Sequence, residues 1–186
     1  TYVDGNFHVD PKALTITAND QTKTYGQSRY FDGSEFTADG LVNGDSVDYA
    51  YMFSGGSSQY AGAGDYGIYL YSYYGSGLEN YSVNLVNGTM HVNPALLTIT
   101  ANDQTKSYGD TFFFQGNEFT VDGLVNGDSV DFVNLFSEGS PSGAQPGIYV
   151  ITPSGAIISA GGFQEDGGGD FFNESFASRA LSTSVT

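Results

Sequence analysis

The sequence contains a long internal duplication, which constrains its fold more than any other feature. Residues 11–54 align without a gap with residues 94–137, and 30 of these 44 positions are identical. The longest shared stretch reads LTITANDQTKTYG in the first copy and LTITANDQTKSYG in the second. Because a repeat of this length corresponds to one structural unit, we expect two copies of the same small fold in tandem.

The duplication also indicates where each module begins and ends. The segment VDGNFHVDP at residues 3–11 matches VNGTMHVNP at residues 86–94, so the chain opens with what reads as the last strand of a further repeat. The sequence therefore predicts three parts: residues 1–10 as a terminal strand of a preceding repeat, residues 11–93 as repeat 1, and residues 94–186 as repeat 2, which diverges from about residue 156. We interpret the chain as part of a longer array.

Local patterns predict strands throughout both copies. In the segment LTITA, Leu14, Ile16 and Ala18 alternate with threonines, which is the period-2 pattern of a half-buried strand. Asn87-Gly88 lies between two alternating runs and predicts a tight hairpin, because both residues tolerate positive φ. The 26 glycines and the many aromatic residues are typical of turn-rich β-structure. We expect an all-β or β-rich α+β fold of two small-sheet modules.

The second repeat has no obvious closing strand after Pro153. Two interpretations stay open: Phe172, Phe176, Leu181 and Val185 form a divergent closing hairpin, or repeat 2 lacks its last strand. In the second case, the N-terminal segment of one copy could complete the sheet of another, with Val3, Phe7 and Val9 as the strand-exchange residues.

Composition excludes several classes of function. The formal net charge of −16 opposes binding to nucleic acids and to anionic membranes, since both are recognised mainly through lysine and arginine. No apolar run is long enough to span a bilayer, so we expect no membrane insertion. The two histidines occupy the same repeat position and have no supporting catalytic motif, so we expect no enzymatic activity.

Two groups of residues are candidate ligand sites. Asp45 and Asp48 in NGDSVD, repeated as Asp128 and Asp131, place two carboxylates beside a flexible turn, and such oxygen ligands suit calcium. Aspartate is also simply a good turn residue, and no other cofactor is expected. In the second candidate site, Tyr69, Tyr71 and Tyr73 would line one strand face, where tyrosines bind sugar rings or pack against a neighbouring module.

Three sequence blocks recur in the same order in both copies, a fourth closes the first copy, and together they resemble a known family. The order LTITANDQTKTYG, EFTADGLVNGDSV, GIYLY and NYSVNLVNGTMHVNPA resembles the MBG (mostly-β-grasp, YG-type) modules of very large bacterial surface proteins. The resemblance covers nearly all of residues 11–155 and part of residues 1–10, and it does not extend to residues 156–186.

This resemblance implies an expected function. It implies β-grasp-like modules in an elongated arrangement, serving as non-enzymatic spacers of a bacterial cell-surface or secreted adhesin, like the filamentous-haemagglutinin-like exoproteins. The expected location is extracellular, and the expected partners are neighbouring repeats of the same polypeptide or identical subunits. The alternatives are an extracellular carbohydrate- or calcium-binding module and a subunit of a head-to-tail, strand-complemented filament.

Overall fold

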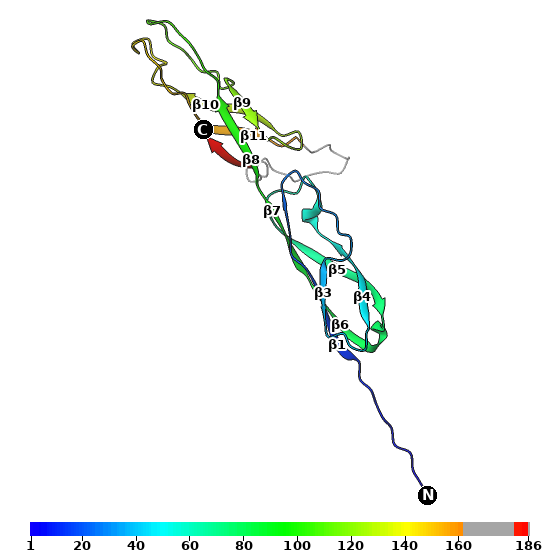
Figure 1. The fold of residues 1–186 in the computed structure, drawn as a ribbon. Helices are drawn as coiled ribbons and strands as arrows, with labels where there is room; N and C mark the ends of the chain where they lie inside the picture. The colour runs from blue at the N-terminus through cyan, green and yellow to red at the C-terminus, as the bar shows by residue number, and fades with distance from the viewer. Residues whose placement is uncertain (162–180, 186) are drawn as a thin grey trace, which may run out of the picture. The chain divides into compact units, whose positions relative to one another are not determined.

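The computed structural model describes residues 1–161 and 181–185 and consists almost entirely of β-strands (Figure 1). The predicted all-β fold of small sheets is confirmed, and no α-helix occurs in these residues. The strands are β1 (Lys12–Ala18), β2 (Gln21–Thr24), β3 (Phe36–Asp39), β4 (Ser46–Phe53), β5 (Gly64–Ser76), β6 (Tyr81–Val86), β7 (Gly88–Asn93), β8 (Ala95–Ala101), β9 (Phe119–Asp122), β10 (Ser129–Phe136), β11 (Thr152–Ser159) and β12 (Leu181–Val185). Two single 3₁₀ turns, Gly55–Ser57 and Leu78–Asn80, are the only helical elements described.

The chain forms two compact units that follow the two repeats only in part. Unit 1 comprises Thr1–Lys23, Ser28–Ser58 and Asp65–His91, and unit 2 comprises Thr24–Gln27, Gln59–Gly64 and Val92–Thr186. Two short internal segments of repeat 1, together with its last two residues, therefore belong to unit 2. One of the internal segments contains the repeated Tyr-Gly pair. The boundaries predicted at residues 10 and 93 stay predictions.

Unit 1 is built on a three-stranded sheet in the order β3-β1-β6 and a four-stranded sheet in the order β2-β7-β5-β4. Strand β1 runs antiparallel to β3 and parallel to β6. Its residues Leu14, Ile16 and Ala18 are buried, which confirms the predicted strand face. They form the core together with residues of the other sheet, namely Ala50, Met52, Ile68, Leu70 and Met90.

Unit 2 repeats the first of these sheets. Strand β8 runs antiparallel to β9 and parallel to β12, with Ala95 opposite Leu181 as Lys12 is opposite Tyr81 in unit 1. Strands β10 and β11 form a separate antiparallel pair. Phe172 and Phe176 of the predicted closing hairpin lie outside the described residues, whereas the segment that ends the chain contributes β12 as a parallel strand.

The hairpin predicted at Asn87-Gly88 is wrong. Strand β6 before it pairs with β1, and strand β7 after it lies between β2 and β5, so the two strands belong to different sheets. Neither residue has the positive φ that a tight hairpin turn requires. The glycine is needed for a different reason: a Cβ at position 88 would lie 2.5 Å from the carbonyl oxygen of Ala18.

Residues 1–11 form an extended segment without strand pairing, and in Figure 1 it runs away from β1. All side chains of this segment are exposed. The assignment of residues 1–10 to the terminal strand of a preceding repeat stays a prediction. No helix in the described part of the chain is long and apolar enough to cross a membrane.

Candidate functional site

The repeated sequence Val-Asn-Gly-Asp forms the same tight turn in both copies. Asn43 and Asn126 have φ values of 59° and 56°, and the glycines that follow them also have positive φ. The amide of Asp45 donates to the carbonyl of Val42 over 3.0 Å, and the corresponding bond in the second copy measures 2.9 Å. Consecutive positive φ angles suit asparagine and glycine, which explains why this dipeptide is kept in both repeats.

A tyrosine hydroxyl binds the aspartate of each turn, and in unit 1 it comes from the same repeat. The Tyr81 hydroxyl donates to Asp45 Oδ2 over 2.8 Å, and the amide of Val42 donates to the Tyr81 oxygen over 2.9 Å. Burial raises the pKa of Tyr81, and the carboxylate of Asp45 raises it further. Tyr81 thus ties the beginning of β6 to the turn that precedes β4.

In unit 2 the tyrosine comes from the other repeat. The Tyr25 hydroxyl donates to Asp128 Oδ1 over 3.3 Å, and the amide of Gly161 donates to the same oxygen over 3.0 Å. Asp128 is buried, and its Oδ2 has no hydrogen-bond partner in the described residues. Burial raises the pKa of Tyr25, and the nearby carboxylate of Asp128 adds to this effect.

The glycine after Tyr25 brings the two segments of unit 2 into close contact. A Cβ on Gly26 would lie 2.8 Å from a methyl carbon of Val125, so only glycine leaves room for that side chain. The carbonyl of Gln59 accepts a hydrogen bond from the amide of Gly26 over 3.1 Å and another from Asn126 Nδ2 over 2.9 Å. We call these contacts, made by Tyr25, Gly26 and Gln59 with Val125, Asn126 and Asp128, the Tyr-Gly contact.

The residues at the matching positions of the other repeat do not make this contact, and they are more exposed. Tyr25 is 6% exposed, whereas Tyr108, at the same position of repeat 2, is 65% exposed. Val125 and Asn126 are half-buried, whereas their counterparts Val42 and Asn43 are exposed. The Tyr-Gly pair of repeat 1 and the Val-Asn-Gly-Asp turn of repeat 2 therefore shield one another from solvent. The matching pair and turn of the other repeats are exposed to solvent.

The four aspartates predicted as calcium ligands are used differently from one another. Asp45 and Asp128 bind tyrosine hydroxyls, as described above. Asp131 is exposed and accepts hydrogen bonds from the hydroxyls of Ser129 and Ser159, which lower its pKa. Asp48 is exposed on β4. The described residues contain no group of three or more histidine, aspartate or glutamate side chains that could hold a metal ion, and calcium binding stays a prediction.

The tyrosines of β5 do not line one face as predicted. Tyr69 and Tyr71 are exposed, but Tyr73 is half-buried, because the pairing of β5 with β4 shifts its register between Tyr51 and Met52. The ring of Tyr71 instead stacks on that of Tyr51 at 5.9 Å, and Tyr74 meets Tyr51 edge-on at 5.8 Å. We call Tyr51, Tyr71 and Tyr74 the tyrosine cluster.

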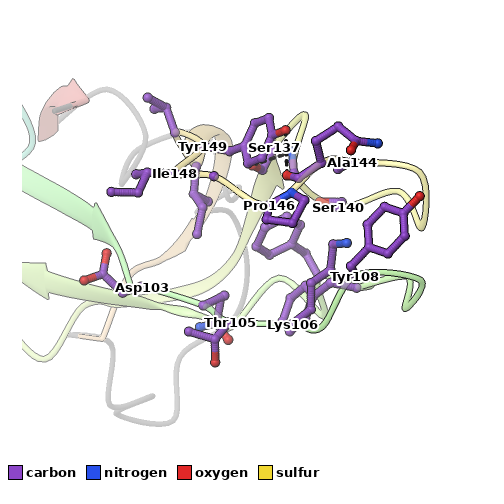
Figure 2. Close-up of a pocket in the computed structure, with 18 of the residues that line it drawn as sticks. Asp103, Thr105, Lys106, Tyr108, Ser137, Ser140, Ala144, Pro146, Ile148 and Tyr149 are labelled. Atoms are coloured by element: carbon purple, nitrogen blue, oxygen red, sulfur yellow. Dashed lines mark hydrogen bonds between the residues drawn. The ribbon is translucent and has the colours of Figure 1, made fainter.

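Unit 2 also contains a groove of about 810 Å³. Figure 2 shows its two walls: one includes Asp103, Lys106 and Tyr108, and the other runs through residues 144–151. Ile148 and Val150 on the second wall are exposed although both are large and apolar. The predicted strand-exchange residues Val3, Phe7 and Val9 are exposed as well, and strand exchange stays a prediction.

Sequence reasoning missed the role of the Tyr-Gly pair and the exposed wall of the groove. The duplication carried a signal for both, because a residue kept in two copies without a catalytic motif is a candidate for a contact between copies. The sequence could not indicate Gln59, which takes part through its backbone carbonyl.

Comparison with known proteins identifies the family of the chain. A family model described as MBG domain (YGX type) matches residues 14–91 and again residues 97–161. Neither the curated proteins nor the solved structures include a significant match to the chain.

Proposed function

Because the chain belongs to the family of MBG domains of the YGX type, we propose that its two repeats are non-enzymatic spacer modules of a bacterial cell-surface or secreted adhesin. In this role the repeats set the distance between other parts of a longer protein. The tandem duplication supports the proposal, because each further copy adds length without adding a new fold. The charge of −16 is compatible with an extracellular location.

The Tyr-Gly contact is the observation that carries this proposal. A spacer needs successive modules to be coupled, and here residues conserved between the two copies serve that purpose. Tyr25 and Gly26 meet the turn of the next repeat, while Tyr108 and Gly109 at the matching position are exposed. In a longer array, Tyr108 and Gly109 would contact the Val-Asn-Gly-Asp turn of a third repeat in the same way.

Small-angle scattering tests the spacer role. A single globule of 186 residues has a radius of gyration of about 16 Å. We expect a clearly larger value and the profile of an extended particle for the Phe7→Asp variant, which is used to exclude association through the N-terminal segment. A value near 16 Å would contradict the proposal.

The tyrosine cluster supports a second candidate function, carbohydrate binding. Exposed aromatic rings that are held side by side by their neighbours can stack on sugar rings. The test is binding to a glycan array by the wild type and by a Tyr71→Ala, Tyr74→Ala double variant, with Tyr30→Ala as a control at another exposed tyrosine. Binding that is lost only in the double variant would favour this function over the spacer.

A further inference from the structure

Six aromatic rings lie together on the outer face of strands β4 and β5 in unit 1. Successive side chains of a strand point to opposite faces of its sheet. On this strand pair the inward side chains belong to the core, namely Ala50, Met52, Ile68 and Leu70. The outward positions carry rings that are exposed or half-buried. We call these rings the aromatic strip, which consists of Tyr49, Tyr51, Phe53, Tyr69, Tyr71 and Tyr74.

The aromatic strip contains three pairs of rings in a row. The pairs are Phe53 with Tyr69, Tyr51 with Tyr71, and Tyr49 with Tyr74. The outer two pairs are direct cross-strand partners, and the rings of the middle pair stack at 5.9 Å. Alternate residues of a strand lie about 6.6 Å apart, so the three pairs span about 13 Å along the strands. A surface of this length accommodates several linked sugar rings.

Neighbouring groups hold the rings of the aromatic strip in place. A Cβ on Gly67 would lie 2.7 Å from the ring of Tyr69, so this ring lies against the backbone of Gly67. In the same way, a Cβ on Gly33 would lie 2.0 Å from the ring of Tyr49. Tyr49 in turn meets Tyr51 edge-on at 4.7 Å. Rings that are already fixed lose little conformational freedom when a ligand binds, and this favours affinity.

The surface of the aromatic strip has a composition that differs from that of a protein interface. Contacts between proteins are enriched in methionine and arginine as well as in aromatic residues. The exposed residues of β4 and β5 include no aliphatic side chain, no lysine and no arginine. Apart from the rings they are Asp48, Gly64, Asp65, Gly75 and Ser76. Rings with hydroxyl groups suit sugars, which present apolar C–H groups on one face and hydroxyls around the edge.

The charge near the aromatic strip distinguishes between kinds of polysaccharide. Asp48 and Asp65 are exposed on the same two strands, and the whole chain has a net charge of −16. These charges repel an acidic polysaccharide and leave an uncharged one unaffected. Asp65 contacts Nδ1 of His91, and a carboxylate has further acceptor sites that suit the hydroxyls of a sugar.

This inference rests on carbohydrate binding, the second candidate function given above. We propose that the aromatic strip binds an uncharged polysaccharide, whose chain lies along β4 and β5 and places successive sugars on successive pairs of rings. The strip belongs to repeat 1 alone, because repeat 2 has Asn134 and Ile151 at the positions of Tyr51 and Tyr71. The Tyr-Gly contact uses none of the strip residues, so coupling between the repeats leaves this surface open.

The second repeat indicates which substitutions the fold accepts. The double variant Tyr51→Asn, Tyr71→Ile gives repeat 1 the two residues that repeat 2 has at these positions. Both side chains are exposed, so we expect an unchanged circular dichroism spectrum. Tyr74→Ser, which matches Ser154, is a milder second variant. Tyr108→Ala, at an exposed tyrosine of unit 2, is the control.

Affinity electrophoresis in native gels tests the class of polysaccharide. The gels contain hydroxyethyl cellulose or galactomannan as uncharged probes, or alginate as an acidic probe. At least one uncharged probe should slow the wild type and Tyr108→Ala, whereas alginate should slow neither. The double variant should bind at least about tenfold more weakly than the wild type. Binding should not depend on ionic strength, because no charges are paired.

Tyrosine fluorescence tests the direction in which the polysaccharide chain lies. The protein has no tryptophan, so its emission comes from tyrosine. In titrations with oligosaccharides of the polysaccharide that binds, the affinity should increase with length until all three pairs of rings are covered. Equal affinity for a disaccharide and for longer oligosaccharides would contradict a chain that lies along the strands.

The outcomes of the gel experiment separate this inference from the candidate functions. If alginate slows the protein as strongly as the uncharged probes, carbohydrate binding stands and the assignment to uncharged polysaccharides is wrong. If the double variant is slowed as much as the wild type, the aromatic strip is not the site. If no probe slows the wild type, the inference and the carbohydrate-binding candidate are both wrong, and the spacer role, which scattering tests, is not affected.

Discussion

At the residue scale, the account depends on Tyr25 and Gly26, because they make a contact that their copies in repeat 2 do not make. Gly26 and Gly109 have nearly the same φ, 90° and 93°, so any other residue is strained at both positions. Only Gly26 faces another side chain at close distance. Comparing the same substitution at the two glycines therefore separates the cost of backbone strain from the cost of the contact with Val125.

We expect Gly26→Ala to destabilise the protein more than Gly109→Ala. Both variants have the strain of a left-handed residue, which costs about 1–2 kcal/mol. In Gly26→Ala the new Cβ must also displace Val125, whereas a Cβ on Gly109 meets nothing within 4 Å. Forcing extra volume into such a contact costs a further ~1–3 kcal/mol. Urea unfolding followed by circular dichroism measures the difference, and equal losses would mean that the contact with Val125 contributes nothing.

The pKa of Tyr25 predicts a pH dependence of stability. Burial raises this pKa above the value of about 10 that tyrosine has in the unfolded chain, so the folded protein holds the proton more tightly. The resulting stability is fully present below pH ~10 and is lost as the pH rises through the folded-state pKa. Over this window the free energy of unfolding should fall less steeply for Tyr25→Phe than for the wild type.

The control for this pH experiment is Tyr30→Phe, at an exposed tyrosine. It should follow the wild-type curve. Parallel curves for the wild type and Tyr25→Phe would show that the hydroxyl of Tyr25 is not buried in the folded protein.

At the scale of elements, the strands were predictable where one face is buried and the other is not. The alternation in LTITA placed Leu14 and Ile16 in the core of unit 1, and the same reasoning holds for Leu97 and Ile99 in unit 2. The hairpin predicted from Asn87-Gly88 was wrong. Glycine is required there because the backbone of Ala18 lies close to it, and not because the chain makes a tight turn. Local sequence does not reveal such a long-range approach.

Adjacent leucines on β8 test the assignment of strand faces. Leu97 is fully buried, so Leu97→Ala should lower the free energy of unfolding by about 2–5 kcal/mol. Leu96 points the other way and is 65% exposed, so Leu96→Ala should change it by less than about 0.5 kcal/mol. Similar losses in thermal or urea unfolding would mean that β8 packs in a different register.

The candidate sites were less predictable than the strands. The tyrosines of β5 were expected on one face, but the register shift near Tyr71 turns Tyr73 inward and brings Tyr51 and Tyr74 to Tyr71. A bulge of this kind depends on the pairing of two strands and leaves no mark in a single-strand pattern. The apolar repeat position of Phe7 and Val9 was visible in the sequence, and strand exchange through them stays a prediction.

At the scale of the whole molecule, one sequence pattern occurs in two environments. Repeat 1 contributes Tyr25 to the turn at Asp128, whereas the turn at Asp45 is bound by Tyr81 of its own repeat. In the proposed array, the copy of this pattern that is open here would provide the contact for a further module. This explains why the Tyr-Gly pair and the Val-Asn-Gly-Asp turn are kept together in both copies of a chain without a catalytic motif.

A double-mutant cycle between Tyr25 and Asp128 tests this claim most directly. Tyr25→Phe removes the hydroxyl, Asp128→Asn removes the charge that it binds, and the double variant does both. If the two side chains are in contact, their effects on the free energy of unfolding are not additive, and we expect a coupling energy of about 0.5–3 kcal/mol. Effects that add to within about 0.3 kcal/mol would mean that repeat 1 and repeat 2 do not meet at these residues, and the account of coupled modules would be wrong.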